Sequence, residues 1–192
     1  MSKIAIFASG SGSNFQALID AAADKQLKTE IVLLVCDKPE AKAVERAEQS
    51  GIPTFVFSPK NYETKEAFEE EIVQNLREKE VDFVILAGYM RLIGSTLLKA
   101  YEGKIVNIHP SLLPAFPGKD AVGQALAAGV KVSGVTIHYV DEGMDTGPII
   151  AQEAVTVTEE DTHESLQAKI QAVEHRLYPK TINKILTTKC YS

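Results

Sequence analysis

The chain has 192 residues, 45% of them hydrophobic and 24% charged, a balance typical of a globular domain and not of a disordered chain. Its 20 basic and 26 acidic side chains give a formal net charge of -6, which argues against a protein that binds nucleic acid through its phosphates. Two cysteines predict no disulfide framework and indicate the cytoplasm. The apolar run Ile4–Ala8 is too short for a signal peptide or a membrane span, so we expect no membrane contact.

The first half of the chain alternates short apolar runs with amphipathic segments. Alternation of this kind predicts βαβ units in an α/β fold, with a doubly wound, mostly parallel sheet whose ligands bind beyond the carboxyl ends of the strands. The expected strands are Lys3–Ala8, Ile31–Cys36, Thr54–Phe57, Phe83–Ala87 and Ile105–Ile108. The expected helices are Asn14–Ala23, Ala41–Gln49, Lys65–Lys79 and Ser95–Tyr101.

The second half has a different pattern. A proline-rich stretch over Asn107–Gly118 shows no helical period, and we expect a short helix at Ala121–Ala128. Two longer strands, Val132–Val140 and Ile149–Val157, enclose the loop Asp141–Pro148. No repeat or long linker divides the chain, so a single domain is predicted.

A last helix is expected after Asp161, which we predict as its N-cap with Glu164 completing a capping box. Pro179 is expected to end or kink this helix, with a further helical piece to about Leu186. Its predicted core face consists of Leu166, Ile170, Val173 and Leu177.

The glycine loop Ser9–Asn14 lies between a strand and a helix. Glycines allow close backbone approach to a ligand, and a helix start offers unpaired N–H groups, so the loop fits a phosphate. It lacks the third glycine of the dinucleotide fingerprint, because Phe15 stands there, and the lysine of a P-loop. A nicotinamide site with Asp37 as the ribose-binding acid, and a simple chain turn, remain alternatives.

Asn107 and His109 come at the end of the fifth predicted strand. Being two residues apart, they share one face of the sheet, and an amide beside an imidazole can stabilise an oxyanion and transfer protons. A structural histidine at a strand end is the alternative. Asp145 is either a turn former or, if it meets His109 in space, part of the same site. We expect His138 to be structural or supporting and His163 to be solvated.

Three motifs together resemble the folate-dependent formyltransferases: Gly10–Asn14, Asn107–Pro114 and Asp145–Gly147. The resemblance runs from about residue 4 to about residue 186. The glycine loop and the segment 173–175 together narrow it to the branch that formylates glycinamide ribonucleotide. It implies one Rossmann-like formyltransferase domain over 1–192. Within it, a phosphate-binding half ends near 100, a catalytic and folate-binding half covers about 101–186, and 187–192 is a tail.

The resemblance implies a role for each matched residue. Asn107, His109 and Asp145 would be catalytic. Lys65 would lie near the glutamate tail of the folate, and Glu174 would contact the sugar or the glycinamide part of the acceptor. The acceptor's phosphate would be bound by Ser11, Gly12, Ser13 and Asn14. The rest of the folate pocket would comprise Met90, Arg91, Leu92, Ile93, Val140, Asp141 and Asp145.

The implied reaction is direct transfer of the formyl group of 10-formyltetrahydrofolate to the amine of glycinamide ribonucleotide, in de novo purine biosynthesis. Asn107 and a protonated His109 would stabilise the oxyanion, while Asp145 keeps His109 charged and helps a water carry the proton. The histidines lack metal-ligand spacing and no GxSxG occurs, so we predict neither a metal nor a serine nucleophile. Both substrates are small molecules, and the oligomeric state, monomer or homodimer, stays open.

Rival interpretations remain. Methionyl-tRNA formyltransferase shares the three polar residues but adds a C-terminal domain and a basic surface, and formyltetrahydrofolate hydrolase adds an N-terminal regulatory domain; we expect neither addition here. A nicotinamide-binding oxidoreductase or a nucleotide-binding module would rest on the glycine loop and Asp37 alone.

Overall fold

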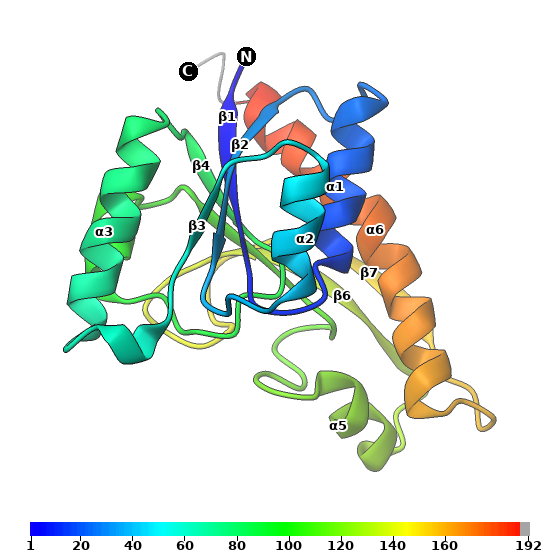
Figure 1. Ribbon diagram of the computed structural model, residues 1–192. Helices are drawn as coiled ribbons and strands as arrows, with labels where there is room; N and C mark the ends of the chain where they lie inside the picture. Colours follow the sequence, from blue (N-terminus) through cyan, green and yellow to red (C-terminus); the bar gives the residue numbers. More distant parts are fainter. Residues whose placement is uncertain (189–192) are drawn as a thin grey trace.

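A seven-stranded sheet forms the centre of the molecule, seen in a computed structural model that describes residues 1–188. The strands lie in the order β3-β2-β1-β4-β5-β6-β7 (Figure 1). Neighbours from β3 to β5 pair in parallel, whereas β6 pairs antiparallel with both β5 and β7, so the predicted mostly parallel sheet is confirmed. The strands are β1 (Lys3–Ala8), β2 (Glu30–Cys36), β3 (Thr54–Val56), β4 (Phe83–Leu86), β5 (Ile105–His109), β6 (Val132–Tyr139) and β7 (Ile149–Thr156).

Helices cover both faces of this sheet. One face carries α1, α2 and α6 and the other carries α3 and α4, while α5 lies beyond the end at which the parallel strands finish (Figure 1). The helices are α1 (Ser13–Ala23), α2 (Lys42–Gln49), α3 (Lys65–Glu78), α4 (Ser95–Ala100), α5 (Ala121–Ala128) and α6 (His163–Thr188), with a 3-10 turn at Pro59–Asn61 that the sequence did not predict.

The central strands have apolar side chains on both faces because both faces are covered. In β1, every residue from Ile4 to Ala8 is fully buried. Two hydrophobic cores result. Phe15 and Leu18 of α1 belong to the core on one face, and Phe68 and Ile72 of α3 to the core on the other. The sheet thus holds the loops at its carboxyl end on a rigid frame.

The start of α6 differs from the prediction by one residue. Thr162 is the capping residue: its hydroxyl accepts from the N–H of Ser165 at 3.2 Å, and Ser165 Oγ accepts from the N–H of Thr162 at 2.9 Å. Asp161 instead holds the preceding turn by accepting from the N–H of Thr158 at 2.8 Å. The predicted pairing of Asp161 with Glu164 is therefore wrong, because a serine and not the glutamate closes the box.

The course of α6 is also longer than expected. Pro179 lies inside a continuous helix that ends at Thr188, so an end at the proline is wrong, and the predicted tail from 187 begins in helix. Cys190 lies outside the described residues, while Cys36 is buried. The buried stripe follows a four-residue spacing and leaves Val173 and Leu177 only half-buried. It consists of Leu166, Ile170, Glu174, Tyr178 and Ile182.

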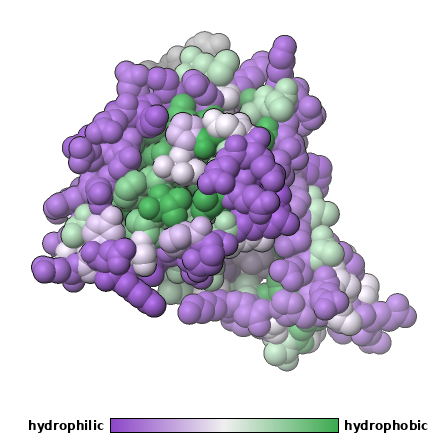
Figure 2. All heavy atoms as spheres, in the orientation of Figure 1, coloured by the Kyte–Doolittle hydropathy of each residue, from purple (hydrophilic) through white to green (hydrophobic). Residues whose placement is uncertain are grey.

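The surface is mainly hydrophilic. Figure 2 shows polar side chains over most of the face in view, with apolar side chains gathered over β3 between α2 and α3. Phe55 on β3 is half-buried there and stacks on Phe57 with ring centroids 5.6 Å apart. Across residues 1–188, no helix combines the length and the apolar character that crossing a membrane requires.

Candidate active site

The loops after β1 and β4 meet where the strand order reverses, at the position where open α/β sheets have their ligand crevice. From β1 the chain continues outward to β2 and β3, then returns to the other side of β1 to form β4. The N–H of Ser9 donates to the carbonyl of Gly88 at 3.0 Å, and Ser9 Oγ accepts from the N–H of Met90 at 2.9 Å. Ligands of open α/β sheets bind at such a reversal, beyond the strand ends.

Asn107 lies on β5 opposite His138 of β6. Its Nδ2 is 3.3 Å from His138 Nε2, and His138 Nδ1 is 2.8 Å from the carbonyl of Tyr139. The carbonyl requires a proton on Nδ1, so Nε2 accepts from the amide and fixes its orientation. Burial lowers the pKa of His138, which favours this neutral form. The expectation of a supporting histidine agrees with this contact.

His109 ends β5 and is 6% exposed. Its Nε2 donates to the carbonyl of Phe116 at 2.8 Å, and its Nδ1 lies 3.5 Å from Asp145 Oδ2. Oxygen atoms therefore lie near both ring nitrogens, one from the backbone and one from a carboxylate. The structure brings the two residues together, which the sequence left conditional.

Asp145 lies in the β6–β7 loop and is held in place by backbone. It has φ of 57°, and its Oδ2 accepts from the N–H of Gly118 at 2.9 Å. Oδ1 lies 3.9 Å from His138 Nε2, so the carboxylate sits between the two histidines. Asp141 shapes the same loop: the hydroxyl of Thr146 and then the N–H of Gly143 hydrogen-bond to it and lower its pKa.

The glycine loop is braced from behind by α2. Gly12 adopts φ of 72° as the N-cap of α1, and a Cβ there would lie 3.0 Å from Ala43. The N–H of Ala43 donates to the carbonyl of Gly10 at 3.1 Å, and Arg46 Nε donates to the carbonyl of Ser11 at 2.7 Å. Two carbonyls of the loop are therefore hydrogen-bonded to α2, which fixes the loop's conformation.

The start of α1 has the unpaired amides that an anion needs. No described side chain caps it, and its first bond runs from the N–H of Gln16 to the carbonyl of Gly12. The preceding amides, including those of Ser13 and Asn14, therefore have no partner within the helix. Positive dipole and free N–H groups together suit a phosphate.

Glu174 interrupts the apolar stripe of α6 and reaches α1. Asn14 Nδ2 donates to its Oε2 at 2.7 Å, and burial of the 7% exposed Glu174 raises its pKa. Asn14 Oδ1 is buried and has no hydrogen-bond partner among residues 1–188. A buried acceptor without a donor fits a ligand that supplies an N–H or O–H.

The residues predicted for the folate pocket do not all face one way. Met90 and Leu92 are 60% and 46% exposed, whereas the side chain of Ile93 is 3% exposed and belongs to the hydrophobic core. Ile93 could thus contact a ligand only through its backbone. Lys65 reaches back from α3 and donates to the carbonyl of Leu92.

Arg91 is occupied by Asp37. Its Nε donates to Asp37 Oδ2 at 2.8 Å, and its guanidinium carbon lies 5.9 Å from the centroid of Phe68. Asp37 has a 2% exposed side chain, so this acid braces the loop after β4. That placement argues against a ribose-binding role and so against a nicotinamide site.

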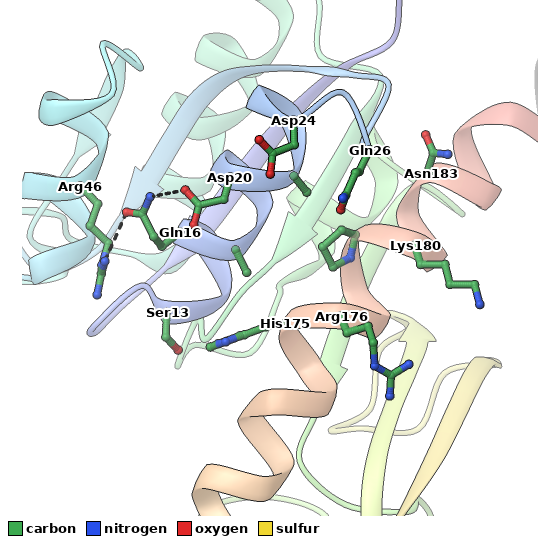
Figure 3. Close-up of a pocket in the computed structure, with 13 residues that line it drawn as sticks. Ser13, Gln16, Asp20, Asp24, Gln26, Arg46, His175, Arg176, Lys180 and Asn183 are labelled. Carbon is green, nitrogen blue, oxygen red and sulfur yellow. Dashed lines mark hydrogen bonds between the residues drawn. The ribbon is translucent and has the colours of Figure 1, made fainter.

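A cavity of about 720 Å³ lies beside this site, between α1 and α6 (Figure 3). Ser13 and His175 stand at its end nearest the glycine loop, and Asp20 and Lys180 lie further along. Asn107, His109 and Asp145 do not line it. The chemistry therefore belongs to the strand ends and not to this cavity.

A Rossmann-like sheet with an amide, an imidazole and a carboxylate at its ligand edge defines a group-transfer enzyme of the α/β class. The family model described as "Formyl transferase" matches residues 2–182. The chain belongs to this family.

Relatives and solved structures of the family agree. The chain is 60% identical over 186 residues to "Phosphoribosylglycinamide formyltransferase" of Bacillus subtilis (strain 168), covering 97% of this chain and 95% of that protein. The crystal structure of phosphoribosylglycinamide formyltransferase from Bacillus halodurans superposes with a TM-score of 0.94 at 65% identity, covering 96% and 95% of the two chains. Glycinamide ribonucleotide transformylase 1 from Geobacillus kaustophilus gives 0.95 at 60% identity, covering 97% and 99%.

Sequence reasoning missed contacts that depend on register. His138 was expected to be structural or supporting, but its partner Asn107 is identified only by the pairing of β5 with β6. His163 is exposed as expected, but its Nε2 also contacts Asp120 Oδ1 at 2.8 Å. Gly118, whose N–H binds Asp145, carried only the signal of a glycine after proline.

Proposed function

We propose that the protein transfers the formyl group of 10-formyltetrahydrofolate to the amino group of glycinamide ribonucleotide, in de novo purine biosynthesis. The observation that carries the proposal is the convergence of Asn107, His109 and Asp145 at the end of β5. The names of the relatives supply the substrates. A cytoplasmic location and action on small molecules, without nucleic acid or membrane, fit the same proposal.

The acceptor binds across the crevice. Its phosphate is bound by Ser11, Gly12, Ser13 and Asn14, through backbone N–H groups at the start of α1. Beyond the phosphate, Glu174 accepts from the sugar or the glycinamide part, and the free Oδ1 of Asn14 offers a second acceptor. The amine then extends toward β5.

The donor binds along the loops after β4 and β6. Exposed apolar side chains at Met90 and Leu92 suit a flat aromatic ring system, and we assign Val140 and Asp141, at the end of β6, to the other side of the same pocket. Arg91 and Ile93 support the loop after β4 that carries Met90 and Leu92: Arg91 through its bond to Asp37, and Ile93 through its side chain in the core. Lys65 near the glutamate tail remains a prediction that requires its ammonium to leave the carbonyl of Leu92.

The chain's polar residues stabilise the transfer. The acceptor's nitrogen forms a bond to the formyl carbon, the bond from that carbon to N10 of the folate breaks, and one proton moves from the attacking to the leaving nitrogen. Asn107 and the protonated His109 stabilise the oxyanion. Asp145 stabilises the charge of His109 and guides the water that moves the proton.

Formyl transfer to glycinamide ribonucleotide, followed with purified protein, tests the proposal. We expect transfer that needs both substrates and that Asp145→Asn reduces strongly. Release of formate without an acceptor would identify a hydrolase instead. When glycinamide ribonucleotide, a folate analogue and NAD are compared side by side, the first two should raise the Tm of the protein and NAD should not.

A further inference from the structure

The turn at 116–120 supplies two of the contacts that hold the catalytic pair. The carbonyl of Phe116 accepts from His109 Nε2 at 2.8 Å, and the N–H of Gly118 donates to Asp145 Oδ2 at 2.9 Å. One short segment therefore fixes the far side of the imidazole and the near side of the carboxylate. A shift of this turn changes the geometry of both groups at once.

This turn has an unfavourable backbone. Phe116, Gly118 and Asp120 have φ of 54°, 80° and 50°, so every second residue is left-handed and only one is glycine. Such conformations persist where surrounding contacts impose them. Pro117 adds no N–H that could close the turn from within.

Two of the contacts that hold this shape come from α5. Gln124 Nε2 donates to the carbonyl of Pro117 at 3.0 Å and to the carbonyl of Lys119 at 2.7 Å. These two carbonyls flank Gly118. The side chain of Gln124 therefore hydrogen-bonds to the turn on both sides of the residue whose backbone N–H binds Asp145. The buried Ala121 and Ala125 anchor the helix that carries Gln124.

We propose that Gln124 is a positioning residue. By donating to the carbonyls of Pro117 and Lys119 it fixes the 116–120 turn, and through this turn it fixes the position of the His109 imidazole relative to the Asp145 carboxylate. This inference rests on the proposed function for its kinetic readout. Gln124 itself touches neither reacting group through any of these bonds, so its effect on the reaction passes through the turn.

Gln124→Met tests the donation, because methionine has a similar length and no N–H. We expect kcat to fall about 10-fold while KM for glycinamide ribonucleotide changes by less than about 2-fold, since the catalytic geometry and not the phosphate loop is disturbed. Gln74→Met is the matched control. Among residues 1–188, the exposed side chain of Gln74 on α3 donates to Glu78 alone, and its loss should leave kcat unchanged.

Gln124→Glu separates donation from bulk. Glutamate has the shape of glutamine, so a residue that merely fills space would tolerate it, whereas a carboxylate facing two carbonyls should lower kcat at least as much as methionine does. Wild-type kcat in folded Gln124→Glu overturns the proposal.

The imidazole Nε2 proton of His109, observed by NMR without substrates, gives a readout independent of activity. In both Gln124 variants its resonance should move, and in Gln74→Met it should not. An unmoved resonance in folded Gln124 variants overturns the inference. An inactive wild-type protein, by contrast, refutes the proposed function while leaving this test intact.

Discussion

At the scale of single residues, hydrogen bonds to neighbouring groups fix the orientation of the polar side chains in the candidate site. The side-chain amide of Asn107 is oriented by its hydrogen bond to a neutral His138. The second N–H of this amide therefore has a fixed direction. Aimed donors cost little reorganisation when charge develops, which is why one such donor contributes substantially to turnover.

Replacing Asn107 with alanine should therefore lower kcat by about 10²–10³-fold, the usual loss for one oxyanion donor. KM should change little, because the interaction strengthens only in the transition state. Steady-state kinetics with both substrates checks this. Near-normal turnover would remove Asn107 from the mechanism.

Glu174 should cost stability at neutral pH. Burial raises its pKa above 4.5 in the folded protein, so between 4.5 and that higher value the folded state holds more protons than the unfolded state. Stability then falls as pH rises through this window. Glu174→Gln keeps an oxygen for Asn14 but removes the charge, so Tm should rise at about pH 8 and rise less at about pH 5.

The matched measurement for this variant is acceptor affinity. Glutamine should weaken binding of glycinamide ribonucleotide while leaving folate binding unchanged. A variant that is no more stable than the wild type at high pH would show that Glu174 carries no burial penalty.

At the scale of elements, the glycine loop and α2 form one unit. Gly12→Ala must both adopt a left-handed conformation, at about 1 kcal/mol, and push against Ala43. The loop should shift and the Kd for the ribonucleotide should rise about 10-fold or more, with folate binding unaffected. Isothermal titration with each ligand checks it; equal losses for both would make the loop purely structural.

The elements themselves followed from the sequence because their apolar periods are local signals. Every predicted strand and helix is present, with ends within one or two residues except at Pro179, where α6 continues instead of ending. The stripe of α6 was misjudged because Glu174 and Tyr178 look polar in sequence and are buried by tertiary contacts. Likewise, Asn107 and His109 were found from their spacing, whereas His138, Gly118 and Gln124 enter the site through strand register and a non-local turn.

At the scale of the whole molecule, α6 fastens the middle of the sheet. Tyr178, fully buried, donates to the carbonyl of Leu86 on β4 at 2.6 Å, and its hydroxyl lies 3.3 Å from the carbonyl of Val106 on β5. The two predicted halves of the chain, divided near residue 100, both contribute strands to this sheet and side chains to both cores. We therefore expect them to unfold in one transition. Tyr178→Phe should reduce stability by about 1 kcal/mol without altering KM.

Unfolding followed by circular dichroism and by tyrosine fluorescence tests this cooperativity. Coincident curves are expected for the wild type and for Tyr178→Phe. Two separated transitions would show that the halves are independent domains.

The order of the strands also sets the distance between the loop after β1 and the end of β5. The phosphate loop follows β1, Asn107 and His109 end β5, and only β4 lies between. Neighbouring strands are about 4.8 Å apart, so the proposed anchor of the acceptor and its proposed point of reaction are about 10 Å apart across the sheet. Hydrogen-bond ladders on both sides of β4 keep that span constant. A phosphorylated amine of shorter reach would occupy the loop, fall short of the formyl carbon, and act as an inhibitor in place of a substrate.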